Sequence, residues 1–120
     1  MSPTARTLAA LRKDGWSAGV VEKWNAHTKI RQDYLGCIDI IAVRGPETLA
    51  VQACAVSGQT ARMKKAASTP GAAAWLAGGA RRFEVWGWGK RLVKRGGKAV
   101  RWHVTIRPVE PVEPSACANT

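Results

Sequence analysis

The sequence predicts a single α/β domain with a mixed central sheet flanked by helices, in the order α-β-β-β-α-β-β. Two apolar runs, Gly36–Val43 and Leu49–Cys54, are joined by a short polar turn, which is typical of paired buried strands. Further stretches alternate apolar and polar residues, and alanine-rich segments between them favour helices. A chain of 120 residues can bury one compact core but not two.

Local signals define the elements of the first half. Ser2-Pro3 begins a helix, and Asp14-Gly15 ends it. We expect a strand over Trp16–Trp24 and a polar, basic segment over Asn25–Tyr34. The two apolar strands follow this segment.

The second half contains a helical segment and two alternating strands. Helix is favoured from Thr60 to Lys65 and again over Ala72–Ala77. Alternation predicts strands over Arg82–Trp88 and Ala99–Arg107, separated by a basic hairpin loop, Gly89–Lys98. From Pro108 onward, proline, valine and glutamate dominate the composition. The chain is therefore expected to form one domain of residues 1–107 and a disordered tail, 108–120.

The charge of the chain indicates a polyanionic partner. Nineteen Lys and Arg against eight Asp and Glu give a net charge of +11, which is typical of nucleic-acid-binding proteins. No apolar run reaches the length of about 18 residues that a membrane span needs. Met1–Ala10 lacks the apolar segment of a signal peptide. The three cysteines show neither zinc-ligand spacing nor a disulfide framework, so we expect a reduced, cytoplasmic protein.

Each apolar strand carries one polar residue that requires an explanation. A carboxylate inside such a strand is costly unless it is paired, hydrogen-bonded or bound to a metal, and Asp39 is such a carboxylate. The period of two places Gln52 and Cys54 on one face of the next strand. If the strands are neighbours, these three side chains converge, and Glu22 on the preceding strand can join them. An alternative is that Asp39 only caps a turn or forms a structural ion pair.

An ordered set of short motifs resembles the PD-(D/E)XK nuclease superfamily. It is most similar to the small Holliday-junction-resolvase-like proteins of bacteria and their phages. The residues that carry the resemblance are Val21–Asn25, Asp33–Asp39, Leu49–Gln52, Ala61–Lys65 and Gly87–Lys90. The similarity spans roughly Leu8 to Arg107. It implies a restriction-endonuclease-like fold.

The resemblance also implies a function: cleavage of branched DNA by metal-activated water, with Mg²⁺ or Mn²⁺ as cofactor. In that family pattern Asp39 is the central metal ligand and Glu22 is a second carboxylate. The carbonyl oxygen of Gln52 would coordinate the ion in place of the usual acid. The resemblance thus implies that Glu22, Asp39 and Gln52 are the catalytic residues. Asp33 is a further candidate acid. Such enzymes usually act as homodimers in the cytoplasm of a bacterium or of a phage-infected cell.

Two residues depart from the family pattern. Cys54 occupies the position where the family usually has a lysine, and Gln52 replaces an acid, so the site should hold Mg²⁺ more weakly. A lysine from elsewhere would have to orient the attacking water, with Lys29, Lys64 and Lys90 as candidates.

A set of basic side chains is expected to contact backbone phosphates. Its members are Lys29, Arg31, Arg62, Lys64, Lys65, Lys90, Arg91, Lys94 and Arg95. Two other functions remain open. The first is a degenerate nuclease fold that binds structured DNA without cutting it. The second is a basic RNA-binding or ribosome-associated protein.

Overall fold

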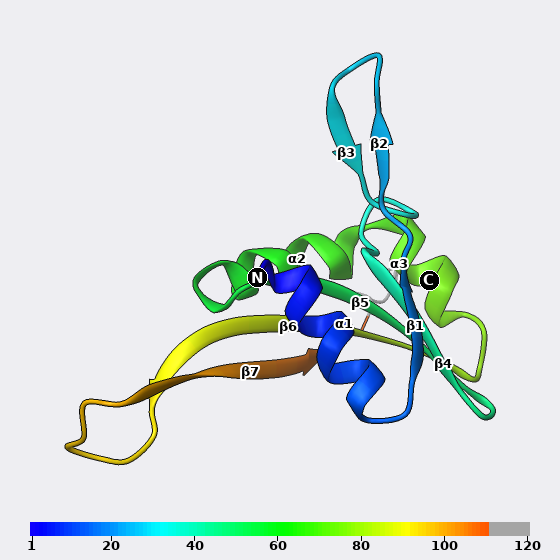
Figure 1. Ribbon diagram of the computed structural model, residues 1–120. Helices are drawn as coiled ribbons and strands as arrows, with labels where there is room; N and C mark the ends of the chain where they lie inside the picture. Colours follow the sequence, from blue (N-terminus) through cyan, green and yellow to red (C-terminus); the bar gives the residue numbers. More distant parts are fainter. Residues whose placement is uncertain (111–120) are drawn as a thin grey trace, which may run out of the picture.

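The computed structural model describes residues 1–110, apart from the side chain of Arg31. A five-stranded mixed sheet with the strand order β1-β4-β5-β6-β7 forms its centre (Figure 1). These strands are β1 (Ser17–Val20), β4 (Ile40–Arg44), β5 (Glu47–Ala55), β6 (Arg81–Leu92) and β7 (Val100–Pro108). The helices are α1 (Pro3–Lys13), α2 (Gln59–Ser68) and α3 (Pro70–Leu76), and a 3-10 turn η1 (Val56–Gly58) precedes α2. The predicted α/β class and its order of elements are confirmed.

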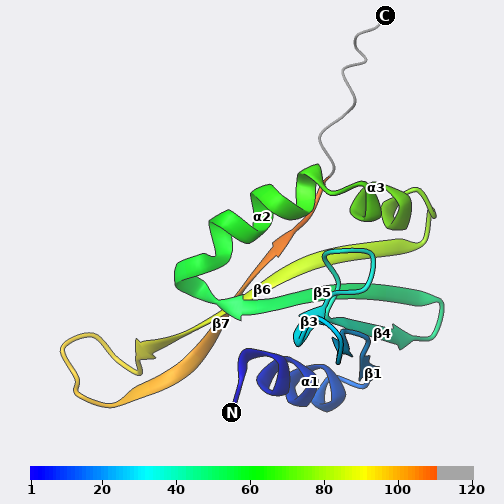
Figure 2. The ribbon, with the colours of Figure 1, turned by 90° about the horizontal axis from the view of Figure 1, so that it is seen from above.

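Helices cover both faces of this sheet (Figure 2). On one face α1 packs over a core that includes Leu11, Leu49 and Trp86. On the other face α2 and α3 cover a second core around Phe83 and Val85. The strands β4 and β5 are antiparallel, whereas β5 and β6 are parallel. A parallel pair needs a crossover connection, and η1, α2 and α3 provide it.

The predicted strand over Trp16–Trp24 is wrong in its second half. Strand β1 ends at Val20, and the next residues form β2 (Lys23–Asn25), which pairs with β3 (Ile30–Gln32) in a separate hairpin. The backbone N–H of Val21 still donates to the Asp39 carbonyl, at 2.9 Å. Beyond that bond the partner strand has ended, so the chain leaves the sheet. Part of the predicted polar segment therefore lies in a projecting hairpin (Figure 1).

The predicted basic loop, Gly89–Lys98, is shorter than expected. Strand β6 continues to Leu92 and pairs with β7 up to the Leu92–Val100 pair. The two strands form a long arm that projects from the body (Figure 1). The molecule accordingly measures 55 × 35 × 35 Å.

Near the end of the described chain, Val109 belongs to the core. Its backbone N–H donates to the Phe83 carbonyl at 2.8 Å, and its side chain is buried. Residues 111–120, which contain most of the predicted tail, lie outside the described residues. Across residues 1–110 the helices lack the length and apolar character required to cross a membrane.

Candidate metal centre

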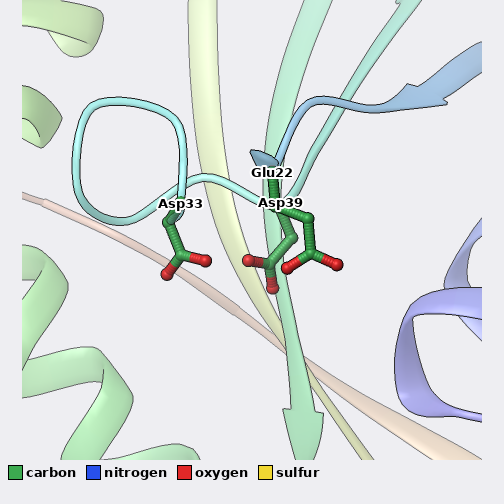
Figure 3. Close-up of side chains that lie close together, drawn as sticks. All are labelled: Glu22, Asp33 and Asp39. Atoms are coloured by element: carbon green, nitrogen blue, oxygen red, sulfur yellow. The ribbon is translucent and has the colours of Figure 1, made fainter. Parts of the chain in front are cut away.

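Three carboxylates meet at one end of the sheet. Oxygen atoms of Glu22, Asp33 and Asp39 all lie within 4.8 Å of one another. Figure 3 shows the three side chains pointing toward the same space. Asp39 is buried, and the other two are half-buried. Because these carboxylates belong to different segments, the cluster depends on how the chain folds around it.

A closed turn brings the two aspartates together. Asp33 and Asp39 flank the turn, whose ends Tyr34 and Ile38 form an isolated bridge with hydrogen bonds of 2.9 Å in both directions. Leu35 and Gly36 adopt positive φ angles of 55° and 81°. This conformation is uncommon for leucine and easy for glycine.

Helix α3 supports that turn from behind. A Cβ atom placed on Gly71 would lie only 2.0 Å from the Leu35 carbonyl oxygen. Only glycine therefore allows the helix to approach the turn this closely. The contact restricts the position of the turn and hence of Asp33.

Asp39 is held by the neighbouring strand. Its Oδ2 accepts a hydrogen bond from the Ala53 backbone N–H at 2.9 Å, and its own N–H donates to the Val51 carbonyl at 3.0 Å. Burial raises the pKa of Asp39 to about 7, aided by the hydrogen bond with Asp33 and by the negative charges of Asp33 and Glu22. The Ala53 hydrogen bond opposes this pKa shift only in part. At neutral pH the carboxyl group therefore retains a proton about half of the time, a proton that a cation can replace.

Gln52 contacts the cluster through Asp33. The side chain is fully buried, and its Nε2 donates to Asp33 Oδ2 at 3.4 Å. Its Oε1 is buried and has no hydrogen-bond partner among the described residues. A buried, unpaired carbonyl costs about 1–3 kcal/mol unless something binds it. The three carboxylates offer oxygen donors only, which suits a hard divalent cation.

Cys54 lies two residues after Gln52 on the same strand and is buried. Burial raises its pKa, and the nearby charge of Arg62 lowers it in part. Lys65 acts on Cys37 in the same way. Two basic residues of α2 therefore act electrostatically on the buried cysteines that also feel the charge of Asp39.

The structure distributes the three candidate lysines over three elements. Lys29 lies in the turn of the β2–β3 hairpin. Lys64 is an exposed residue of α2. Lys90 lies on β6 with its Nζ over the ring of Trp102, 5.4 Å from the centroid. Of the other predicted phosphate-binding residues, Arg91 lies on β6 and Lys94 and Arg95 in the exposed loop after it. The side chain of Arg31 lies outside the described residues.

The comparisons with known proteins gave no further guidance. No family model matches the chain, and neither curated proteins nor solved structures gave a match. The structure itself shows an α/β fold with a mixed sheet and an acidic cluster that could hold a metal ion. Sequence reasoning identified Asp39, Glu22 and Gln52 and named Asp33 as a further acid. It missed Gly71, whose only signal is a Pro-Gly pair at the start of a helix.

Proposed function

We propose that this protein is a metal-dependent endonuclease that acts on branched DNA. The observation that carries the proposal is the buried, unpaired Oε1 of Gln52 beside the three-carboxylate cluster. The expected ion is Mg²⁺ or Mn²⁺, since both prefer oxygen ligands. The resemblance to the PD-(D/E)XK superfamily supports the same chemistry.

In this proposal each residue of the cluster has a distinct role. Glu22, Asp33 and Asp39 would hold the ion through their carboxylates, and Gln52 through its amide oxygen. The hydrogen bond from Ala53 orients Asp39. A bound ion lowers the pKa of a coordinated water and neutralises charge on a phosphate.

Arg62 and Lys65 are proposed to supply the positive charge that the family obtains from its lysine. Both belong to α2 and act electrostatically on the two buried cysteines next to the cluster. A guanidinium group cannot accept a proton at neutral pH. Arg62 would therefore stabilise the negative charge of the phosphate and would not act as a base.

We further propose a homodimer in the cytoplasm of a bacterium or of a phage-infected cell. Two clusters related by symmetry would then face the two strands to be cut. The strong positive charge of the chain supports a DNA partner.

A second candidate function is binding of structured DNA without cleavage. It is favoured by Cys54 at the lysine position and by Gln52 at the acid position. Both substitutions remove a charged group on which the chemistry of the family depends.

The test is cleavage of a labelled four-way DNA junction with Mg²⁺ and then with Mn²⁺, beside linear duplex and flap controls. Asp39→Ala should lower the rate at least about a thousandfold, equivalent to about 4 kcal/mol of transition-state stabilisation. Asp14→Ala is the matched control, because Asp14 is an exposed carboxylate paired with Arg44. Calorimetry should show Mn²⁺ binding that is lost only with Asp39→Ala.

Junction binding without cleavage in either metal would favour the second candidate function. Equal cleavage by wild type and Asp39→Ala would exclude the acidic cluster as the site.

A further inference from the structure

The arm formed by β6 and β7 has two different faces. Directly paired residues of antiparallel strands share a face. On the face that also carries α2 and α3, the pairs are Val85–Arg107, Gly87–Thr105, Gly89–His103 and Arg91–Arg101. On the α1 face, the pairs are Trp86–Ile106, Trp88–Val104, Lys90–Trp102 and Leu92–Val100. The first face is polar and basic toward the tip, whereas the second is mainly apolar.

The basic face places two like charges at opposed positions. Arg91 and Arg101 are register partners, and Arg91 Nη1 lies at hydrogen-bond distance, 3.4 Å, from His103 Nε2. Like charges at opposed positions destabilise a sheet. Within residues 1–110 no carboxylate forms an ion pair with these arginines. The sequence contains no acidic residue between Glu84 and Glu110. An anion from outside the chain would relieve this repulsion.

A small hollow at the root of the arm provides a place for such an anion. It has a volume of about 100 Å³, and its lining residues are Val56, Gly89, Lys90, Arg91, His103 and Thr105. A Cβ atom on Gly89 would lie 2.7 Å from Val56 Cγ1, so a larger residue there would force the Val56 side chain to shift. Two of the lining residues, Arg91 and His103, carry nitrogen-bearing side chains on this face, whereas the Lys90 Nζ lies over Trp102 on the other. The chemistry of the hollow therefore favours a phosphate group.

The root of the arm is anchored on both faces. Gln59 Nε2 donates to the carbonyls of Val85 and Thr105, at 3.0 and 2.7 Å. On the other face the Arg6 guanidinium lies 3.7 Å from the centre of the Trp102 ring. Two independent contacts thus restrict the direction in which the arm leaves the body.

The basic face also shares a side of the sheet with the acidic cluster. Gln52 is the register partner of Val85, which in turn pairs with Arg107. Residues aligned in this way point to the same side of a sheet. A polyanion on the exposed part of the basic face would therefore lie on the same side of the sheet as Gln52, with η1 and the start of α2 covering the strands between them.

We propose that this face of the arm binds the phosphodiester backbone of double-stranded nucleic acid, with one phosphate in the hollow between Arg91 and His103. The proposal rests on the proposed function in naming a nucleic acid as the partner. A two-stranded β-ribbon has the width of the major groove, which also suits a duplex. A second copy of this chain is a poorer occupant, because each copy carries a charge of +11.

The experiment measures binding of a labelled DNA duplex by fluorescence anisotropy, in EDTA so that no cleavage occurs. Salt is varied between about 50 and 200 mM, and a duplex RNA of the same sequence is run beside it. The test variant is Arg91→Gln with Arg101→Gln. The matched control, Lys13→Gln with Lys23→Gln, removes two exposed charges outside the arm. A second variant, Arg91→Lys with Arg101→Lys, keeps the charge.

We expect the glutamine variant to lower affinity at least about tenfold and to reduce the slope of log K against log salt by about 1.8. The control should change neither, and the lysine variant should retain most of the binding. The melting temperature of the glutamine variant should not fall, because the repulsion has been removed. Stronger binding of duplex RNA than of DNA would identify RNA as the source of the phosphates.

Unchanged affinity and slope in the glutamine variant would overturn the proposal, as would an equal loss in the control. These results separate the arm from the metal centre. If the glutamine variant lost duplex binding in EDTA and wild type did not cleave the junction, the result would support the role of the arm and contradict the proposed nuclease activity. Cleavage that depends on Asp39 but not on the two arginines would do the reverse.

Discussion

The acidic cluster and the basic arm both crowd like charges together, but they do so in different environments. The three carboxylates are buried or half-buried, and a backbone hydrogen bond from Ala53 holds that of Asp39. The arginines of the arm are exposed, so water and salt screen their repulsion. Because burial raises its pKa, Asp39 can gain or lose a proton near neutral pH, so the net charge of the cluster can change. The arginines of the arm stay protonated at neutral pH, so their charge is fixed. The contrast is consistent with the two proposals, a small cation at the acidic cluster and a polyanion on the arm.

The largest expected effect that sharpens this comparison is a pH dependence of stability. In metal-free protein, folded Asp39 binds a proton up to about pH 7, whereas the unfolded residue releases it near its ordinary pKa of 3.8. The free energy of unfolding should therefore fall as the pH rises from about 4 to 7, by up to about 1.4 kcal/mol per pH unit. Asp39→Asn should remove this component.

The measurement is urea denaturation of both proteins in EDTA at several pH values. The difference in stability between wild type and Asp39→Asn should decline with pH and become constant above about pH 7. A constant difference throughout would contradict the raised pKa of Asp39.

A second prediction breaks the support of the cluster without touching a carboxylate. Gly71→Ala places a Cβ atom against the Leu35 carbonyl and must displace the turn beside Asp33. The free energy of unfolding should fall by about 1–3 kcal/mol, and Mn²⁺ binding should weaken. Thermal unfolding and calorimetry would measure the two effects.

Gly79→Ala is the control, because a Cβ atom there meets nothing within 4 Å. If both variants were equally stable and bound Mn²⁺ equally well, the turn would not depend on α3.

A third prediction changes the charge of the cluster. Gln52→Glu places a fourth carboxylate at the cluster and should tighten Mg²⁺ binding about tenfold, or about 1.4 kcal/mol. Without metal the same variant should be less stable at neutral pH, because a fourth carboxylate joins the cluster. Gln52→Leu should weaken Mg²⁺ binding instead. Unchanged binding in Gln52→Leu would show that the amide oxygen is not a ligand.

The smallest expected effect concerns the root of the arm. Arg6→Ala removes the cation that lies over the Trp102 ring and should cost about 0.5–1 kcal/mol. Hydrogen exchange should become faster in the arm and stay the same around the acidic cluster. Lys13→Ala, an exposed change in the same helix, serves as the control. Faster exchange in the arm of that control would indicate a general effect of α1.

Much of the fold could be predicted because its signals are local. Ser2 caps α1, with its Oγ accepting from the Ala5 N–H at 3.1 Å. The run Leu49–Cys54 lies within β5, whereas the run Gly36–Val43 forms part of a turn and then β4, which begins just after Asp39. Asp39 and Gln52 stood out because burial without a partner is costly, and that cost does not depend on the details of the fold.

Tertiary structure alone decided the rest. Glu22 reaches the cluster because the chain leaves the sheet after Val20, where the partner strand ends. Asp33 joins it through a turn with positive φ angles that α3 supports. Arg62 and Lys65 of α2 act on the two buried cysteines, and the sequence alone could not distinguish α2 from the other basic segments. In each case the deciding contact joins residues far apart in the chain or depends on where a neighbouring strand ends. Neither kind of contact leaves a periodic pattern in the sequence, so sequence analysis could not detect it.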